Sequence, residues 1–305
     1  MRFFRLSVVV VVAGLLPSTS SVGSQGAQDT TRLQTAWTSL WDGKSLDEWT
    51  TWMRQPEPTS EVPGLARDAN GKYTEPIGSG RDPLRVFTVS RDVDGRPAIR
   101  ISGEVFGELR TKASFKDYHL RLQFKWGEKK WPPRAGETTA RDSGLLYHVH
   151  AAPGAEGRTW ARSIELQIQE RDVGDLYAVG SVIAVHARPR AGTQPVLYDY
   201  DPTGDWTFFS QSQGASGRCI KQPDNEKRTG DWNTVELICF RDDAIHIVNG
   251  KVVMRLHGPT RIDTEVPTPV TSGPIILQSE GAEVFYREIA IRSITAIPPE
   301  FAAKP

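Results

Sequence analysis

The two-residue alternation of apolar and polar side chains is the feature that most limits what this chain can fold into. Segments 118–126 and 163–170 alternate strictly. Because successive side chains on a strand point to opposite faces, each segment is expected to bury one face and present the other. No window of a dozen residues has the helical spacing of apolar residues. Many short alternating segments between Gly- and Pro-rich turns predict an all-β fold, an antiparallel sandwich or jelly roll with long loops.

Polar side chains gather on one face of the strands predicted between residues 118 and 170. If these strands are neighbours in one sheet, as sequential strands often are, their polar faces form one surface. The side chains that would line it are Arg121, Lys125, His148, His150, Glu165 and Gln167. A merely solvated face tends to carry Lys, Glu, Thr and Ser, whereas imidazoles, amides and a carboxylate suit directional recognition. The pattern indicates a binding or catalytic site within residues 142–175.

Two tryptophans and three acidic residues lie in or just before this stretch. Trp131 and Trp160 lie on either side of its first strand. A flat aromatic face packs against the C–H groups of a sugar ring and leaves the hydroxyls for hydrogen bonds, which favours a carbohydrate ligand. The alternative is that each tryptophan pins a loop. Glu170, Asp172 and Asp175 are candidate ligands for a divalent cation, and a solvated acidic turn is the other interpretation.

Composition and motifs exclude several classes of protein. The chain has 37 basic and 37 acidic residues and a formal net charge of zero, so it lacks the basic footprint of a nucleic-acid or anionic-membrane binder. It contains no P-loop, no G-x-S-x-G elbow and no H-E-x-x-H motif. Cys219 and Cys239 lack the spacing of a metal or redox site. A disulfide between them and two free buried thiols are both compatible with the sequence.

The N-terminus has the pattern of a secretory signal peptide. Arg2 and Arg5 precede an apolar run over residues 6–16, which small and polar residues follow. That run is short for a bilayer span, and no later stretch is long and apolar enough, so we expect a secreted or periplasmic protein without a membrane span. The predicted divisions are a signal peptide (1–28), a disordered spacer (29–36), a jelly-roll domain (37–297) and a C-terminal tail (298–305).

Seven motifs in order resemble a known family. They are L-W-D-G-K-S-L-D-E-W, Y-H-L-R-L-Q-F-K-W, D-S-G-L-L-Y-H-V, S-I-E-L-Q-I-Q-E, D-W-N-T-V-E-L, I-H-I-V-N-G-K-V-V and G-P-I-I-L-Q-S-E-G-A-E-V-F-Y-R-E-I-A-I. The set, over about residues 37–295, resembles the 3-keto-disaccharide hydrolase domain family, also described as 3-keto-glucoside 1,2-lyases and 3-keto-2-hydroxyglucal hydratases. The resemblance implies a concanavalin A-like jelly roll, similar to laminarinase-like glycoside hydrolases.

The resemblance also implies a substrate class. An upstream sugar 3-oxidoreductase makes a ketone at C3, which acidifies the C2 proton; a base removes this proton, the C1 substituent leaves, and water is added. On this expectation Glu165 or His148 is the base, and Gln167 orients a hydroxyl. Lys125, His150 or a bound divalent metal stabilises the enolate. The other expected substrate contacts are Arg121, Trp131 and Trp160.

The chain departs from the laminarinase-like pattern at the catalytic strand. That pattern carries carboxylates as E-x-D-x-E, whereas here Glu165 is followed by Gln167 and Gln169. The departure disfavours ordinary two-carboxylate glycoside hydrolysis. A conventional glycosidase and a non-catalytic lectin-like module remain the alternatives, because the same fold and aromatic rim would serve either.

Overall fold

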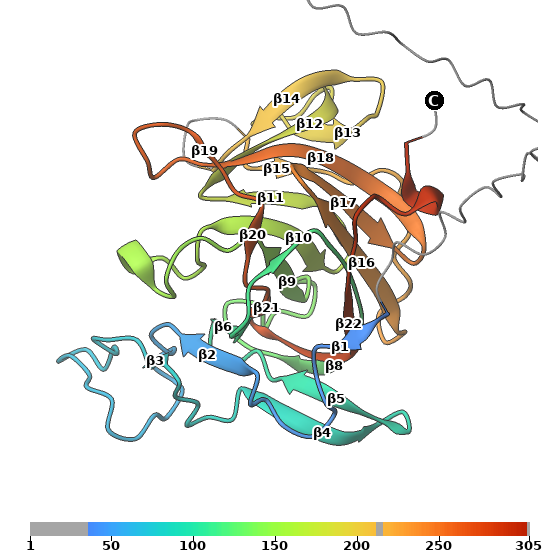
Figure 1. Cartoon of the computed structure of the whole chain (residues 1–305). Coiled ribbons are helices and arrows are strands. Elements are labelled where there is room, and N and C mark those ends of the chain that lie inside the picture. Colours follow the sequence, from blue (N-terminus) through green and yellow to red (C-terminus); the bar gives the residue numbers. More distant parts are fainter. Residues whose placement is uncertain (1–35, 212–215, 304–305) are drawn as a thin grey trace, which may run out of the picture. The chain divides into compact units, whose positions relative to one another are not determined.

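The computed structural model describes residues 36–211 and 216–303, which form an all-β domain (Figure 1). Its two large sheets are antiparallel, with 12 and 8 strands. Helical structure in these residues is confined to two short 3-10 helices, η2 (Ala155–Gly157) and η3 (Pro299–Phe301). The predicted two-sheet antiparallel jelly-roll sandwich is confirmed.

The larger sheet has strands from both halves of the chain. Its order is β13 (Tyr198–Tyr200), β12 (Ser181–Pro189), β18 (Lys251–Arg261), β17 (Asp243–Val248), β16 (Asn233–Phe240), β8 (Tyr118–Lys130), β22 (Ala282–Ser293), β5 (Arg96–Ile101) and β4 (Phe87–Val93). Three further strands pair at its sides: β14 (Asp205–Phe209) with β12, β1 (Thr38–Ser39) with β22, and β19 (Thr268–Pro269) with β18.

The smaller sheet is the one that positions the site described below. Its order is β15 (Arg218–Cys219), β11 (Leu176–Val179), β10 (Ser163–Gln169), β9 (Asp142–Tyr147), β21 (Ile276–Ser279), β6 (Gly107–Thr111), β2 (Trp49–Met53) and β3 (Gly78–Ser79). A separate pair joins β7 (Phe115–Lys116) to β20 (Ser272–Gly273).

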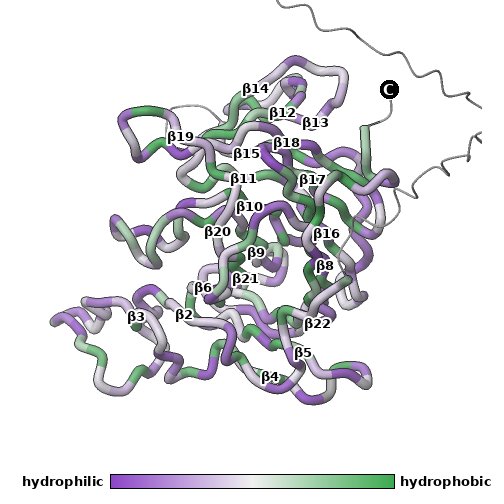
Figure 2. Tube along the Cα trace, in the orientation of Figure 1, coloured by the Kyte–Doolittle hydropathy of each residue, from purple (hydrophilic) through white to green (hydrophobic). Residues whose placement is uncertain are grey.

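The hydrophobic core lies between the two sheets. Leu120 and Leu122 of β8 meet Leu145 of β9 and Leu166 of β10 in one cluster of buried residues. Hydrophobic segments follow the strands of both sheets in Figure 2. Removing apolar surface from water stabilises the fold by roughly 25 cal/mol per Å², so alternate residues of each strand are committed to this interior. The intervening residues must then face outwards.

The turn signals in the sequence are mostly correct. Asp94–Gly95 joins β4 to β5. Asn249 (φ 48°) and Gly250 (φ 79°) join β17 to β18, and both have the positive φ that a type I′ turn requires. The segment 171–230 contains more structure than the one strand predicted there, namely β11, β13, β14 and β15. These strands have only two to five residues, too few for an alternating pattern to stand out.

The expectation that the strands between residues 118 and 170 are neighbours in one sheet is wrong for one of them. β9 and β10 do pair, with Leu145 opposite Leu166. β8 instead lies in the larger sheet between β16 and β22, because later parts of the chain supply its partners. Arg121 and Lys125, which alternate with the core residues of β8, therefore lie on the outer face of the opposite sheet.

The two ends of the chain are only partly included in the described residues. The predicted signal peptide (1–28) and residues 29–35 of the predicted spacer fall outside the described part. Within that part, no helix has the length and apolarity needed to cross a membrane. Near the C-terminus, Phe301 packs against an apolar cluster that includes Ile245, and its carbonyl accepts a hydrogen bond from Arg255 Nη2 at 2.6 Å. Packing thus continues past residue 297, where a tail was predicted.

Leu237 tests the position of the core. Its side chain is fully buried in β16, so Leu237→Ala removes buried methyl groups and leaves a cavity. We expect the free energy of unfolding in urea to fall by about 2–5 kcal/mol. Lys251→Ala, at an exposed position, is the control and should change it by less than about 0.5 kcal/mol. Equal effects of the two substitutions would contradict this placement of the core.

Candidate active site

A cluster of polar side chains lies on the outer face of the smaller sheet. Residues directly opposite each other on paired strands share a face. Gln167 of β10 is opposite Gly144 of β9, and Gln278 of β21 is opposite Glu108 of β6. The polar cluster, as the term is used from here on, consists of Glu108, Asp142, Glu165, Gln167, Gln278, Arg134 and Glu280.

Gly144 lets side chains from two strands meet. A Cβ atom at this position would lie 2.1 Å from Glu165 Oε1 and 2.2 Å from Gln278 Oε1. Glu165 comes from β10 and Gln278 from β21, on either side of the strand that holds Gly144. The absent side chain therefore leaves the space above β9 in which a carboxyl and an amide come together.

The cluster is buried although it lies outside the inter-sheet core. Glu108 and Gln278 are 0% exposed, Asp142 is 2% exposed, and Glu165 and Gln167 are each 5% exposed. An outer sheet face is commonly solvated, so this burial requires a cover.

Loops on the smaller-sheet side supply that cover. The connection between β9 and β10 carries Trp160, whose ring stacks on Phe106 with the centroids 6.1 Å apart. Arg110 Nη1 donates a hydrogen bond to Ala151 O in the same connection at 3.0 Å. Trp160, predicted as a substrate contact, thus lies on the face that holds Glu165, where it also packs beside Leu146.

Burial shifts the carboxyl groups toward their neutral forms. It raises the pKa of Asp142 to about 8, with the negative charge of Glu280 adding and Arg134 opposing. Burial also raises the pKa of Glu108 to about 7. The positive charge of Arg110, whose Nη1 lies 3.9 Å from Oε1, offsets only part of this rise. The pKa of Glu165 is raised well above its usual value by burial and by the charges of Glu280 and Asp142.

Arg134 holds two of the acidic side chains together. It forms ion pairs with Asp142 and, at 3.2 Å, with Glu280. Asp142 Oδ2 also accepts a hydrogen bond from Gln169 Nε2 at 2.7 Å. The guanidinium lowers the cost of placing two carboxyl groups near each other in a desolvated region.

Within the described part of the chain, several buried polar atoms of the cluster lack hydrogen-bond partners of ordinary geometry. They are both carboxyl oxygens of Glu108, both amide atoms of Gln278, Asp142 Oδ1 and Arg134 Nε. Buried polar groups are normally paired, and leaving one unpaired costs about 1–3 kcal/mol. Unpaired polar atoms at these positions are what a site for a polar ligand or ordered water requires.

The histidines predicted for the site do not join Glu165. The extended backbone of β9 ends at Tyr147, and His148 has a φ of 53°, so the alternation that assigned its face stops there. Its ring lies 5.1 Å from the Tyr147 ring, and its charged neighbours are His150 and Asp117. Burial lowers the pKa of His148 to about 4, so this imidazole is a weak base.

Three other predicted residues are engaged elsewhere. Lys125, on the larger sheet, has its Nζ 2.8 Å from Asp94 Oδ2. The guanidinium of Arg121 lies over the Trp37 ring, 4.3 Å from its centroid. Trp131 Nε1 donates a hydrogen bond to Ser102 O at 3.0 Å, the loop-pinning role left open as an alternative.

The acidic turn after β10 is paired with arginines. Glu170 Oε1 lies 2.9 Å from Arg141 Nη1, and Asp172 Oδ1 lies 2.8 Å from Arg218 Nη2. Asp175 accepts a hydrogen bond from Arg218 Nε at 2.8 Å. These three carboxylates of the turn form ion pairs with arginines. The arrangement fits the acidic-turn interpretation better than the interpretation as a cation site.

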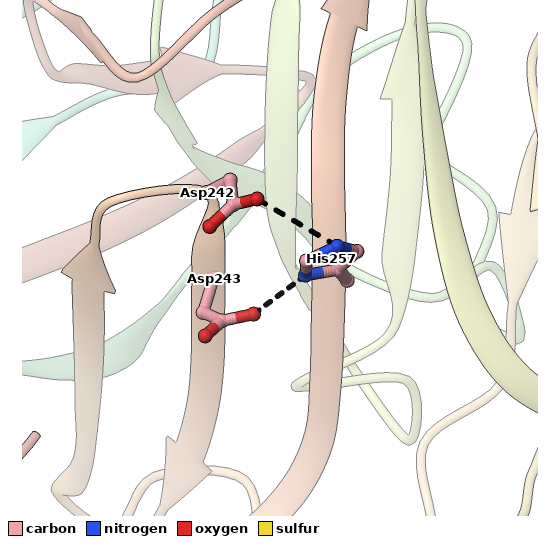
Figure 3. Close-up of side chains that lie close together, drawn as sticks. All are labelled: Asp242, Asp243 and His257. Atoms are coloured by element: carbon pink, nitrogen blue, oxygen red, sulfur yellow. Dashed lines mark hydrogen bonds and ion pairs between the residues drawn. The ribbon is translucent and has the colours of Figure 1, made fainter.

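One group of possible metal ligands occurs among the residues described. Asp242, Asp243 and His257 offer ligand atoms that lie within 4.8 Å of one another (Figure 3). They belong to the β16–β17 turn, β17 and β18 of the larger sheet, away from the polar cluster. Cys219 and Cys239 are free and buried, in β15 and β16 of different sheets, and burial raises the pKa of Cys239 to about 12.

Comparison with known families identifies the relatives of this chain. A family model described as a 3-keto-alpha-glucoside-1,2-lyase-like domain, the 3-keto-disaccharide hydrolase domain, matches residues 36–292. The chain belongs to this family. Membership supports a carbohydrate-active, hydrolase-type enzyme. No curated protein matches the sequence.

Solved structures with a similar arrangement of strands have low sequence identity. One from Parabacteroides distasonis ATCC 8503, provisionally described as a glycosyl hydrolase, is 18% identical with a TM-score of 0.45, over 85% of this chain and 100% of that one. LamAcat from Zobellia galactanivorans is 12% identical (TM-score 0.38; 86% and 98% covered). The carbohydrate-binding module CBM66 from Bacillus subtilis is 9% identical (TM-score 0.36; 68% and 92% covered). These likenesses carry no argument about activity.

Sequence reasoning missed most of the polar cluster. Glu108, Asp142, Arg134 and the Gln278–Glu280 segment are far enough apart in the chain that no local spacing links these four parts. One signal was available in the closing motif, where Gln278 directly follows the apolar run I-I-L. A polar side chain within an otherwise apolar strand indicates either a buried partner or a site.

The raised pKa of Glu108 predicts a pH-dependent stability difference. The folded state holds this proton more tightly than the unfolded state, so the stabilisation is complete below about pH 4.5 and is lost as the pH rises through about 7. Over this pH interval, the free energy of unfolding of the wild type should fall by up to about 3 kcal/mol relative to that of Glu108→Gln. Urea unfolding at a series of pH values measures it, with the exposed Glu61→Gln as control. A constant difference between wild type and Glu108→Gln would contradict the raised pKa.

Proposed function

We propose that the polar cluster binds a 3-keto-glycoside and that the enzyme breaks its glycosidic bond by elimination, followed by addition of water. The observation that carries the proposal is the set of buried, unpartnered carboxyl and amide atoms on one face of the smaller sheet. The description of the family, a 3-keto-alpha-glucoside-1,2-lyase-like domain, supports the substrate class.

Glu108 is the proposed base. Its pKa of about 7 lies near neutral pH, where a general base combines a useful ionised fraction with a useful proton affinity. Among the residues that the structure describes, its oxygens have no hydrogen-bond partner of ordinary geometry, and Arg110 Nη1 lies 3.9 Å from Oε1. The carboxylate removes the C2 proton, and the electron pair left behind forms the enolate with the C3 ketone.

Gln278 is the proposed partner of the developing oxyanion. It pairs with Glu108 across β21 and β6, so the amide lies beside the base. Its buried Nε2 has no hydrogen-bond acceptor among residues 36–211 and 216–303. A donor already aligned in a water-poor site stabilises charge that appears in the transition state.

Glu165 is the proposed acid. Because burial and the charges of Glu280 and Asp142 raise its pKa well above the usual value, its carboxyl group holds its proton more tightly than an exposed glutamic acid does. It gives its proton to the leaving oxygen as the C1–O bond breaks. In the hydration step its carboxylate takes a proton from water, which adds at C1, and Glu108 returns the proton to C2.

This assignment revises the roles expected from the sequence. Glu165 keeps a catalytic role but as the acid, and Gln167 keeps a hydroxyl-orienting role. Gln167 Oε1 accepts a hydrogen bond from the Ile168 backbone N–H at 2.8 Å, which fixes the amide. His148 has no role in this assignment because its pKa is low. Lys125 has none because it lies on the opposite sheet, paired with Asp94.

Conventional glycoside hydrolysis is the second candidate function. The absence of a second carboxylate on the strand of Glu165 disfavoured it, but Glu108 and Asp142 bring carboxyl groups to the same face from β6 and β9. Native and 3-oxidised glucose disaccharides, supplied side by side with and without a chelator, separate the two. Cleavage restricted to the oxidised sugar supports elimination, cleavage of both supports a glycosidase, and binding without cleavage supports a lectin-like module.

The proposal includes a location and a reaction partner. The signal-peptide pattern of residues 1–28 supports export to the periplasm or the medium. A ketone at C3 must be installed before this reaction, so a sugar 3-oxidoreductase acts upstream.

Glu165→Gln provides the direct test. The amide keeps the shape of the side chain but cannot donate an acid proton, so turnover of a 3-keto-glycoside should fall by about 10²- to 10⁴-fold. Lys125→Ala, on the opposite sheet, should leave turnover unchanged. The measurement is steady-state kinetics on the oxidised disaccharide. Full activity in Glu165→Gln, or a comparable loss in Lys125→Ala, would contradict the proposed site.

A further inference from the structure

The outer face of the larger sheet contains a pocket of about 700 Å³. Strands β17 and β18 contribute Ile245 and Arg255 to its lining, and the C-terminal segment contributes Glu300. Figure 1 shows that segment passing beside β17 and β18. The pocket is thus on the opposite sheet from the polar cluster and shares no lining residue with it.

Two pairs of facing residues complete the lining of the pocket. His186 of β12 is directly opposite Trp206 of β14, so their side chains share a face. Asp243 of β17 is directly opposite His257 of β18 and the two share a face in the same way. All four residues line the pocket.

Trp206 is an exposed aromatic surface held in a defined position. Its side chain is 53% exposed, which is unusual for so large an apolar group. Its ring lies on the His186 ring, with the centroids 3.8 Å apart and the planes at 33°. His186 Nδ1 is 2.8 Å from Gly204 O, which orients the imidazole beneath the indole. A platform fixed before binding loses little conformational entropy when a ligand stacks on it.

Hydrogen-bonding groups stand next to this platform. His257 lies between two aspartates, with Nδ1 2.8 Å from Asp243 Oδ1 and Nε2 3.6 Å from Asp242 Oδ2 (Figure 3). Its ring centroid is 5.8 Å from that of Trp206. The carboxylate of Asp243 has lone pairs beyond the one directed at His257, so it can accept further hydrogen bonds from hydroxyl groups.

We propose that this pocket is a second carbohydrate-binding site, in which a neutral sugar ring stacks on Trp206 and donates hydroxyl hydrogen bonds to Asp243. A sugar presents C–H groups on one face and hydroxyls at its edge, which matches an indole beside a carboxylate. Asp242, Asp243 and Glu300 carry more negative charge than Arg255 carries positive, which disfavours an anionic ligand. The pocket's size is within the usual range for small-molecule sites. The site is independent of the proposed reaction.

Tryptophan side-chain NMR tests the proposal in the full-length protein. The indole N–H signal of Trp206 is identified as the one missing from Trp206→Phe. Cellobiose and maltose, unoxidised glucose disaccharides, are then titrated into the wild type. We expect at least one of them to shift the Trp206 signal saturably, and to do so equally in Glu165→Gln, whose change is confined to the polar cluster. A Trp206 signal that neither sugar moves up to its solubility limit would overturn the proposal.

Two substitutions separate a sugar site from a general surface effect. Asp243→Asn should weaken the affinity measured on the Trp206 signal by about tenfold, because a charge-assisted hydrogen bond becomes a neutral one. Phe208→Ala is the matched control, since Phe208 is 66% exposed on the same strand and the same face but does not line the pocket. It should leave that affinity unchanged. Equal affinities in wild type and Asp243→Asn would overturn the assigned contact, and a loss in Phe208→Ala would show non-specific association and overturn the site.

Discussion

The desolvation of carboxyl groups on the outer face of the smaller sheet is the constraint on which the candidate active site depends. Glu108, Asp142 and Glu165 are buried there, and each has its pKa raised chiefly by that burial. Such groups are costly to bury in their charged forms, so the fold places them where they are neutral or paired. Arg134 and the gap above Gly144 make the arrangement possible, the first by charge and the second by space.

The same constraint connects stability with chemistry. A carboxyl group whose pKa lies near neutrality can both hold and release a proton at that pH, which an exposed carboxylate does poorly. The three side chains have different surroundings: Glu108 faces Arg110, Asp142 faces Arg134, and Glu165 is near like charges. Differences of this kind are how one site provides both an acid and a base.

The two outer faces of the sandwich have different characters. On the smaller sheet, loops cover the polar cluster and leave its members at most 5% exposed, apart from Arg134 and Glu280 at its edge. On the larger sheet, the pocket is lined in part by exposed side chains, among them Trp206 and His257. A covered site favours proton transfer away from water, whereas an open platform favours reversible contact with a sugar surface. The core separates the two faces, so each can be altered without rebuilding the other.

Local alternation was sufficient to determine the fold class and the face of several residues. Glu165 and Gln167 were assigned to a face away from Leu166, and the structure has them there, because a strand has a strict period of two. The alternation does not apply to His148, because its backbone leaves the extended region at φ 53°. The sequence by itself therefore determined strands, turns such as Asn249–Gly250, and which side chains avoid the core. Only the tertiary structure decided that β8 joins the larger sheet and that Gln278 lies beside Glu108 and, above Gly144, beside Glu165. Strand order depends on pairing between residues far apart in the chain, and no spacing within a single segment encodes that pairing.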